Sequence, residues 1–476
     1  MAVGAGLARG DNTFSTGRHC GAVATCAVPF LRDDLDRRIV RLAVPALGTL
    51  AVEPVYVLVD TAIVGQLGTP ELAGVAIASL ILLNLLALVD FLEYLTPDIA
   101  FAVGSGRVDH ARRTATTGLW LTALIGVPAA LVVGLFARPL CWLVGGRGEV
   151  LDHATTYLSI SAIGVPFVLV SVLGHGVLRG YNDMRNPLRI VVVANVANLV
   201  LEVVAVYGLD MGVAGSAGTT VVVQVAAAAA FLWAMRHHLA RHRPHWAEYR
   251  PLLVTGAHAA IRAMAMYTVW NLSTVVAARM DDATLAANQV VTQLFMFLAL
   301  VLDALAVPLH SLVAGALGAG RAQEAAHIGE RSVRLSVWGA GGLALVLAAS
   351  APVLPLLFTD DPAVRDRLVV ALLVLAVMQF PGSVAFALDG ALIGAHDMGW
   401  LGRQAILNIA PFVLAISFTV VWPSLGLAGI WGAQMVWMTV RAAVNHRRWQ
   451  HLAGRGFDHV LTTVSDEGAG AGPVDL

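Results

Sequence analysis

Two acidic residues, Glu53 and Asp60, lie within the otherwise apolar stretch 39–65. A carboxylate inside a segment long enough to cross a membrane is energetically costly, and such residues usually mark an ion or substrate pathway. A separation of seven residues is two helical turns, so both side chains would share one face, about 10 Å apart along the helix axis. In a soluble protein, the same two acids would indicate only a contact between helices. Their meaning therefore depends on whether the chain spans a membrane.

A second polar stripe lies in the apolar stretch 188–208 and consists of Asn195, Asn198 and Glu202. Positions i, i+3 and i+7 share one helical face. A carboxylate in a low-dielectric cavity favours its protonated form, so it can take up H⁺ at one side of a membrane and release it at the other. Na⁺ would instead need several oxygen ligands at once, which Asp60 and these three side chains could supply. These residue types leave the choice between H⁺ and Na⁺ open.

The composition favours an integral membrane protein. Of the 476 residues, 58% are hydrophobic and 13% are charged, whereas soluble domains are about 45–50% apolar and about 25% charged. The formal net charge of −1 gives no basic field, so no nucleic-acid partner is expected. The three cysteines (Cys20, Cys26 and Cys141) form no disulfide framework and no His or Cys spacing fits a metal site, so no cofactor is expected beyond the coupling ion.

Twelve apolar segments are long enough to cross roughly 30 Å of hydrocarbon at about 1.5 Å of helix rise per residue. Their approximate limits are 39–65, 73–100, 115–137, 154–178, 188–208, 212–235, 254–279, 285–315, 332–357, 366–393, 403–422 and 426–446. The even-numbered connections carry more arginine than the odd ones, so the positive-inside rule places them and both termini in the cytoplasm. We therefore expect an all-α, multi-pass protein of the cell inner (plasma) membrane, surrounded by the lipid bilayer.

The two halves of the chain are related by an internal repeat. GVLRGYNDM at 176–184 matches GALIGAHDM at 390–398, an offset of 214 residues, and GVAG at 212–215 matches GLAG at 426–429 at the same offset. Two repeats of six spans each have the same orientation and enclose a pathway between them. The sequence therefore predicts two homologous six-helix lobes around a central cavity.

The predicted lobes have definite limits along the chain. They are preceded by a disordered extension, joined by a cytoplasmic linker and followed by a tail. The boundaries are 1–36 for the extension, 37–236 for the N-terminal lobe, 237–253 for the linker, 254–448 for the C-terminal lobe and 449–476 for the tail.

The repeat is chemically asymmetric. The positions equivalent to the polar stripe of the fifth segment are Ile409, Phe412 and Ile416, and those opposite Glu53 and Asp60 are Met266 and Ser273, to within one residue. The acids have therefore no counterpart in the second half. We expect the coupling ion to bind in the N-terminal lobe.

Several stretches resemble the multidrug and toxic compound extrusion (MATE) transporters, and in particular their DinF-like branch. They are AVPALGTLAVEPVYVLVDTAIVGQLGTPELAGVA, LRGYNDMRNP, NVANLVLEVVAVYGLDMGVAG, DDATLAANQV, GALGAGR and LDGALIGAHD. The resemblance covers about residues 37–450. It implies twelve helices in two lobes that export amphipathic, often cationic, small organic compounds by alternating access. The driving gradient would be inward H⁺, which the branch favours, or Na⁺.

The resemblance also implies roles for individual residues. Asp60 matches the first-helix acid that these transporters use for cation coupling, and Asn198 and Glu202 match positions lining the same cavity. Pro45 matches the early proline of that helix, at which a helix bend is implied.

Further candidates come from position within the spans. Glu53 and Asn195 are added to the ion-coupling set, although Glu53 could equally pair with a neighbouring helix. Arg262 in the seventh segment could be a counter-charge to an acid, but we expect it to extend towards the cytoplasmic face. The candidate residues of the substrate cavity are Tyr56, Gln289, Asp303 and Asp389. For the two aspartates, a fixed polar contact between helices is slightly favoured over a role in the cavity.

Two segments depart from the family pattern. Glu93, Pro97 and Asp98 stand where a more neutral run is expected, and VPLHSL at 307–312 replaces a stretch containing Ala and Gln. These departures keep a non-transporting scaffold or sensor open as an alternative to drug export. The other alternative is a lipid-linked-saccharide flippase of the same superfamily, although such flippases usually have two extra spans and a cationic cavity. No catalytic or phosphate-binding motif is present, so an enzyme is not expected. A monomer is expected.

Overall fold

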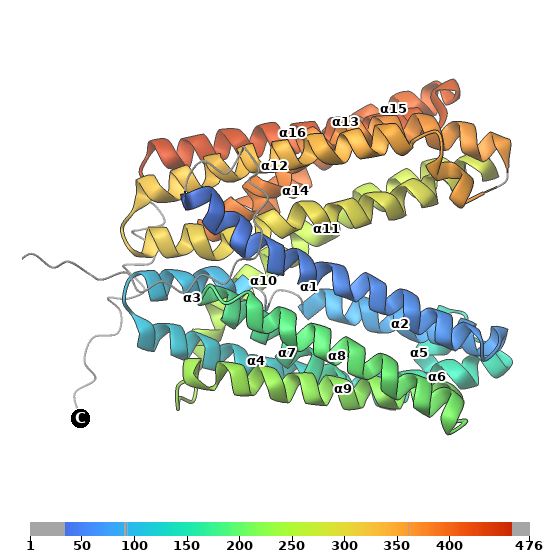
Figure 1. Ribbon diagram of the computed structural model, residues 1–476, viewed down its shortest axis with the longest axis horizontal. Helices are drawn as coiled ribbons and strands as arrows, with labels where there is room; N and C mark the ends of the chain where they lie inside the picture. Colours follow the sequence, from blue (N-terminus) through green and yellow to red (C-terminus); the bar gives the residue numbers. More distant parts are fainter. Residues whose placement is uncertain (1–33, 90–91, 93, 360, 459–476) are drawn as a thin grey trace, which may run out of the picture.

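The computed structural model describes residues 34–89, 92, 94–359 and 361–458 (Figure 1). Cys20, Cys26, Glu93, most of the predicted extension and the end of the predicted tail lie outside the described residues. Within this part of the chain the regular structure is helical.

The N-terminal half contains nine α-helices in its described residues. They are α1 (Asp34–Gly65), α2 (Thr69–Val89), α3 (Leu95–Gly104), α4 (Val108–Leu135), α5 (Ala137–Val144), α6 (Gly148–Ala162), α7 (Val165–Gly180), α8 (Arg185–Val203), continued by the π-helical turn η2 (Val204–Gly208), and α9 (Gly212–Met235). A short 3-10 turn, η3 (Arg236–His238), leads into the linker.

The C-terminal half contains seven α-helices in the portion that the structure describes. They are α10 (Trp246–Ala278), α11 (Asp282–Gly318), α12 (Ala322–Ser350), α13 (Pro362–Gly394), α14 (Met398–Leu407), α15 (Ile409–Val421) and α16 (Gly426–Gly454), with 3-10 turns η4 (Leu354–Leu357) and η5 (Pro423–Leu425). Helix α1 begins before residue 36 and α16 ends after residue 448, so both helices reach into the predicted extension and tail.

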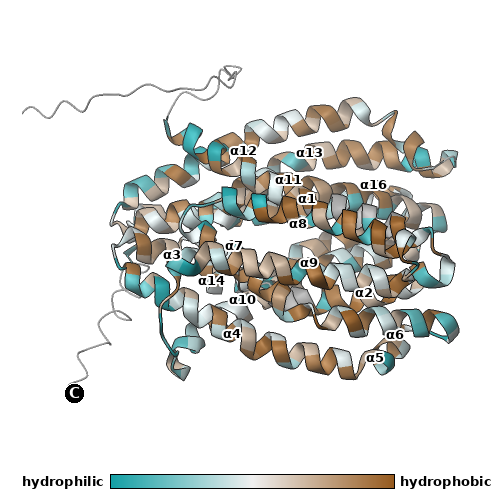
Figure 2. Ribbon diagram, turned by 60° about the horizontal axis from the view of Figure 1, so that its bottom comes forward, coloured by the Kyte–Doolittle hydropathy of each residue, from teal (hydrophilic) through white to brown (hydrophobic). Residues whose placement is uncertain are grey.

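Eight helical stretches of the described chain are long and apolar enough to cross a membrane, and α6 with α7, bent by 52°, makes a ninth. The remaining three predicted segments coincide with α1, with α2 and α3 together, and with α16. Figure 2 shows hydrophobic residues along the helices and hydrophilic residues mainly towards the two ends of the bundle. Large apolar side chains such as Leu124, Leu131 and Leu345 are exposed, as expected for helices that face lipid.

The backbone conformation of several turns is repeated in the two halves of the chain, as the sequence is. Three pairs of residues with positive φ lie in turns that follow equivalent helices of the two halves. The members of each pair are separated by the same number of residues as the internal repeat. They are Gly106 (77°) with Gly320 (70°), Asn182 (60°) with His396 (60°), and Gly212 (55°) with Gly426 (53°). Since few residues adopt positive φ, their recurrence shows that the turn geometry is duplicated.

Each lobe has its own hydrophobic core, and a further cluster joins the two lobes. Ile39 of α1 and Phe101 of α3 are buried together with Leu309 and Val313 of α11. Helices α1 and α3 therefore pack against the C-terminal lobe at the end where α1 begins and α16 ends (Figure 1). Towards the opposite end the ribbons of the two lobes diverge.

Glycines allow α3 and α11 to approach each other closely at the end where the two lobes are in contact. A Cβ on Gly104 would lie 2.2 Å from the carbonyl oxygen of Gly315, and a Cβ on Gly318 would lie 2.1 Å from that of Phe101. Both distances are far shorter than van der Waals contact, so α3 and α11 meet here only because neither glycine has a side chain. The protein is therefore closed at one end.

Ionic contacts also join the lobes at the closed end. Nε and Nη2 of Arg331 on α12 lie 2.9 and 2.6 Å from the two carboxylate oxygens of Asp36 on α1. Asp98 of α3 lies 3.0 Å from Nε2 of His396, which follows α13. Asp98, an unusual residue in the second segment, thus has a structural role in the contact between lobes.

Candidate functional site

Three polar side chains meet inside the N-terminal lobe, where α1, α8 and α9 pack together. Asp60 of α1, Glu202 of α8 and Ser216 of α9 lie within interaction range of one another. Glu202 and Ser216 are fully buried. Asp60 Oδ1, both carboxylate oxygens of Glu202 and Ser216 Oγ are buried and make no well-formed hydrogen bond. The hydroxyl of Ser216 is the one hydrogen-bond donor among these described side chains, and it faces two carboxyl groups.

One helical turn along α8, a second contact extends the cluster. Nδ2 of Asn198 donates to Oγ1 of Thr220 on α9 at 3.3 Å, and Oδ1 of Asn198 is buried without a partner. Residues 198 and 202 of α8 therefore face 220 and 216 of α9. Asn195 lies apart from these contacts, since its Nδ2 donates to the carbonyl of Val191 in its own helix at 2.9 Å.

A π-helical turn, η2, begins directly after the cluster. It adds a residue to the helical turn and so changes the direction of the side chains that follow Glu202; such turns often occur at functional sites. The hydroxyl of Tyr207 in this turn lies 3.1 Å from the carbonyl of Ile63 and 3.2 Å from Oε1 of Gln66. These contacts join the end of α8 to the end of α1 and hold Asp60 opposite Glu202.

The electrostatics of this cluster favour a bound cation. Two ionised carboxylates only accept hydrogen bonds and repel each other, so a contact between them becomes favourable when one carries a proton or a cation lies between them. The buried oxygens of Asp60, Glu202, Ser216 and Asn198 could also act together as Na⁺ ligands. In the described chain no group of three or more His, Cys, Asp or Glu side chains is arranged to hold a metal ion.

The other predicted site residues of the N-terminal lobe are placed only in part. Glu53 and Tyr56 belong to α1, but their side chains lie outside the described residues. Pro45 lies within α1, which continues as one helix through it. The hydroxyl of Thr49 donates to the carbonyl of Pro45 at 3.0 Å.

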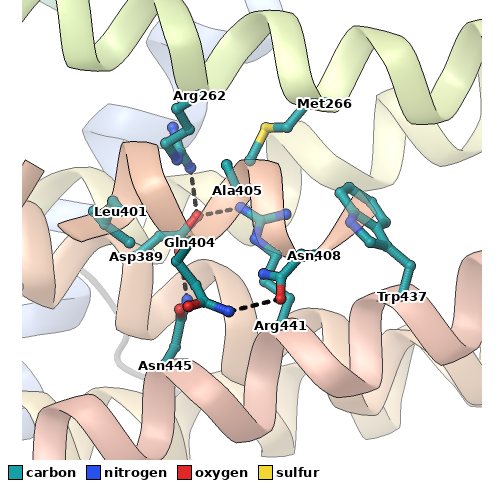
Figure 3. A pocket seen from close by; sticks show the side chains of 10 residues that line it. All are labelled: Arg262, Met266, Asp389, Leu401, Gln404, Ala405, Asn408, Trp437, Arg441 and Asn445. Carbon is teal, nitrogen blue, oxygen red and sulfur yellow. Dashed lines mark hydrogen bonds and ion pairs between the residues drawn. The ribbon is translucent and has the colours of Figure 1, made fainter. Parts of the chain in front are cut away.

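A second polar cluster lies inside the C-terminal lobe (Figure 3). Arg262 of α10 and Arg441 of α16 both donate to Oδ2 of Asp389 on α13, and Nδ2 of Asn445 donates to its Oδ1 at 2.5 Å. The expectation that Arg262 extends towards the cytoplasmic face is therefore wrong, because its guanidinium forms an ion pair with Asp389 within the lobe. Asp389 and Arg441 are 4% and 6% exposed.

The remaining cavity candidates do not join this cluster by hydrogen bonds. Asp303 of α11 is close enough to Arg262 and Arg441 to interact electrostatically, but no ion pair to it is present among the described residues. Gln289, near the start of α11, is exposed. Phe412 and Ile416 are buried in the apolar core of the C-terminal lobe, which agrees with the loss of acidic side chains at these positions.

Sequence reasoning missed four residues of the two clusters: Ser216, Thr220, Arg441 and Asn445. Each pair is spaced by four along one helix, so both members share a helical face. Ser216 and Thr220 lie in the first turns of α9, which are rich in glycine and alanine. Small polar residues are common in such stretches, so nothing in the sequence indicated that these two belong to the site. Arg441 and Asn445 stand inside the twelfth apolar segment, where a buried arginine could have been noticed.

Comparison with known proteins agrees with this architecture. The MatE family model matches residues 45–204 and again residues 259–421. The two matches begin 214 residues apart, which is the offset of the internal repeat. Each lobe is therefore one copy of the family's domain.

Relatives and solved structures of the same kind match most of the chain. Protein DETOXIFICATION 44, chloroplastic, of Arabidopsis thaliana is 28% identical over 85% of this chain and 80% of its own length. DNA damage-inducible protein F of Escherichia coli is 28% identical over 87% and 93%. The crystal structure of a multidrug resistance MATE family transporter in an outward-facing conformation has a TM-score of 0.81 at 20% identity, covering 91% of this chain and 99% of that one.

A MATE structure in the bent conformation has a TM-score of 0.83 at 20% identity, covering 92% of this chain and 99% of that one. These structures are twelve-helix membrane proteins in two lobes, so the predicted fold class is confirmed. The resemblance in the sequence is confirmed as well, because the family model matches in both lobes. The chain is a multi-pass membrane protein that belongs to the MatE family of multidrug and toxic compound efflux transporters.

Proposed function

We propose that this protein is an antiporter that exports amphipathic organic compounds, often cationic, and is driven by inward movement of H⁺ or Na⁺ through the N-terminal lobe. The observation that carries the proposal is the contact between Asp60 and Glu202, since Oδ1 of Asp60 and both carboxylate oxygens of Glu202 are buried and make no well-formed hydrogen bond. A cation supplies the missing partner. H⁺ is favoured, because one proton is enough to let one carboxyl group donate to the other.

Alternating access would couple this ion to the substrate. The lobes are in contact at the end that carries the start of α1 and the end of α16. With both termini in the cytoplasm of a bacterial cell, as the arginine distribution predicts, this conformation is open to the outside and a rocking of the lobes would expose the other side. The protein would work as a monomer in the inner membrane, since each chain contains both lobes.

The available driving force is sufficient for such a cycle. One elementary charge crossing the membrane contributes about 2.3 kcal/mol per 100 mV. Each unit of pH difference contributes about 1.4 kcal/mol per proton. Asp60 lies in α1, which spans from the closed end to the ion cluster and contacts both lobes. Ion binding at Asp60 can therefore change the conformation of α1, the helix that contacts both lobes.

Efflux from proteoliposomes tests this proposal. The full-length protein is reconstituted with a cationic dye, and efflux is followed first under an imposed pH gradient and then under an imposed Na⁺ gradient. We expect Asp60→Asn to abolish driven efflux, while Asp109→Asn, which changes an exposed acid at the start of α4, keeps the wild-type rate. Equal rates for wild type and Asp60→Asn under both gradients would disprove the coupling role. If the wild type moves neither dyes nor other organic compounds, the scaffold alternative is favoured.

A further inference from the structure

A third polar cluster lies in the N-terminal lobe, outside the two clusters described above. It consists of Arg112 near the start of α4, Tyr181 in the turn after α7 and His238 in η3. The rings of Tyr181 and His238 are stacked, with 3.8 Å between their centres. The guanidinium of Arg112 is close enough to both rings to interact with them electrostatically. Three elements that are distant in the sequence therefore bring one cation and two polar aromatic side chains together.

Two hydrogen-bond donors of this cluster have no acceptor. Nε of Arg112 and the hydroxyl of Tyr181 are buried and make no well-formed hydrogen bond within the described chain. Asp109 forms an ion pair with Arg112, but its exposed carboxylate lies 3.6 Å from Nη1 and leaves Nε unsatisfied. Burial raises the pKa of the Tyr181 hydroxyl above its ordinary value of 10.0, so the hydroxyl keeps its proton at neutral pH and can donate. Because buried donors without acceptors are costly, these two indicate an anion with several oxygen atoms as the missing partner.

The surroundings of the cluster also favour an anion. Arg113, Arg236 and His237 are exposed next to it in the sequence. Asp183 interacts electrostatically with His238, but its carboxylate already accepts hydrogen bonds from two backbone N–H groups and one side-chain amide of its own turn. The nearby acid therefore does not satisfy the two donors.

The internal repeat shows that the fold does not require polar side chains at these three positions. At the repeat offset, the residues that correspond to Arg112, Tyr181 and His238 are Ala326, Ala395 and Leu452. Ala395 and Leu452 are buried in the hydrophobic cluster that joins the lobes, and Ala326 packs against it. The C-terminal lobe thus fills the equivalent place with apolar side chains. Packing alone therefore does not explain two unsatisfied donors in the N-terminal lobe.

Exposed side chains on the same helices indicate the rest of the ligand. Trp120 of α4 and Trp233 of α9 are 47% and 68% exposed, and tryptophan is enriched where a membrane meets water. Arg112 precedes Trp120 and His238 follows Trp233, so the cluster lies beyond both tryptophans, towards the helix ends. In the other direction along α4, Leu124 is exposed where hydrocarbon would lie. A ligand at this depth would have an anionic part beside Arg112 and an apolar part beside α4.

We propose that Arg112, Tyr181 and His238 bind the phosphate of an anionic phospholipid whose acyl chains lie against α4. Nε of Arg112 and the hydroxyl of Tyr181 donate to the phosphate oxygens, and the imidazole of His238 lies beside them. Such a lipid holds α4, the turn after α7 and the start of the linker together. This site is separate from the ion cluster around Asp60, and the inference goes beyond the proposed export function and does not depend on it.

Native mass spectrometry of the purified full-length protein in detergent tests the site without requiring transport, because it counts bound lipid molecules. The probe is dioleoylphosphatidylglycerol, and the zwitterionic reference is dioleoylphosphatidylcholine. We expect the first molecule of the anionic lipid to bind at least about fivefold more tightly than the reference, because the site is cationic. Arg112→Gln should weaken binding of the anionic lipid at least about tenfold, because it removes a charged hydrogen bond to the phosphate.

Two further variants separate a specific site from general attraction to a basic surface. Tyr181→Phe removes only a hydroxyl that makes no well-formed hydrogen bond to the described protein, so it should keep the unfolding temperature of the lipid-free protein. It should nevertheless weaken binding of the anionic lipid roughly fivefold. Arg113→Gln is the matched control, because it makes the same change of charge at the exposed neighbouring position. Its affinity should stay within about twofold of the wild type.

Equal losses of affinity in Arg112→Gln and Arg113→Gln would overturn the inference, since the lipid would then respond only to the overall charge of the surface. Unchanged binding by Tyr181→Phe, or equal affinity for the two lipids, would overturn it as well. Inorganic phosphate distinguishes a lipid from a free anion. We expect it to displace no more lipid than chloride does at equal ionic strength; preferential displacement by phosphate would identify a site for free phosphate and exclude the lipid.

Discussion

The carboxylate of Asp98 lies 3.0 Å from Nε2 of His396, and this contact joins the two lobes where they meet. Both residues stand at unusual positions: Asp98 replaces a neutral residue in the family pattern, and His396 occupies the repeat position of Asn182. The ring of His396 also lies edge-on to Phe101, with 5.5 Å between ring centres. Asp98, which departs from the family pattern in the second segment, therefore contacts a residue of the other lobe.

Replacing His396 should loosen the closed end slightly. His396→Asn removes the contact with Asp98 but keeps a residue that tolerates positive φ, as Asn182 does at the equivalent turn. Because both side chains are partly exposed, we expect a loss of up to about 1 kcal/mol, or roughly fivefold in the closed population. Spin labels at the exposed positions Arg113 and Gln323 would measure the distance between lobes. An unchanged distance distribution would show that the contact contributes nothing to closure.

Replacing Arg331 should have a larger effect. Asp36 is 2% exposed and receives two hydrogen bonds from Arg331 across the lobes, so Arg331→Gln leaves a buried carboxylate without its counter-charge. The expected shift is about 2 kcal/mol or more, roughly thirtyfold towards separation of the lobes. The same spin labels report it. Arg334→Gln, an exposed arginine one turn further along α12, is the control and should leave the distances unchanged.

Adding a methyl group where α3 meets α11 should prevent closure. In Gly318→Ala the new Cβ would lie 2.1 Å from the carbonyl oxygen of Phe101, a backbone atom that cannot move independently. Overpacking of this kind costs about 1–3 kcal/mol, and we expect dye efflux to fall at least about tenfold while the protein still folds. Gly342→Ala, in a helix where the Cβ meets no atom within 4 Å, should export normally. Normal efflux by Gly318→Ala would refute tight closure as part of the cycle.

Substitutions on α8 should distinguish residues that take part in ion coupling from neighbouring residues that do not. Glu202→Gln removes one of two facing carboxyl groups, so ion-driven efflux should fall by about one to two orders of magnitude, as expected when a buried charged ligand is lost. Asn195→Ala should stay within about twofold of the wild type, because Asn195 bonds only to its own helix in the described structure. Initial efflux rates across a series of imposed pH gradients would measure both. Similar losses in the two variants would argue against a localised site.

The N-cap of α11 should show a pH-dependent contribution to stability. Hydrogen bonding from Arg367, and then from the backbone N–H and hydroxyl of Thr284, lowers the pKa of Asp281 from 3.8 to about 2. The stabilisation is therefore present above pH 3.8 and is lost as the pH falls to about 2.

We expect Asp281→Ala to lower the free energy of unfolding by about 1 kcal/mol at neutral pH, because it removes the cap. The charge contribution is smaller than the pKa shift suggests, since Asp281 is largely exposed to solvent. Thermal unfolding in detergent should show the difference from wild type shrinking between pH 4 and pH 2. Asp282→Ala, at the exposed neighbouring position, should show no such pH dependence.

Much of the architecture was determined by the sequence alone. The apolar segments predicted the spans because every backbone polar group in lipid must be satisfied within a helix. The 214-residue offset predicted two lobes, and the same offset recurs in the backbone turns and in the family matches. Asp60 and Glu202 stood out because acids within apolar segments are rare.

Which side chains meet could not be predicted from the sequence. Arg262 contacts Asp389, 127 residues away, and Arg441 contacts it from 52 residues away. Spacing along one helix shows which residues share a face, but the rotation of that helix and its register against others depend on packing across the whole lobe. For that reason the sequence predicted that Asn198 and Glu202 share a face of α8. It gave no sign that Asn195 stays apart from their cluster, that Ser216 completes it, or that two arginines meet Asp389 in the opposite lobe.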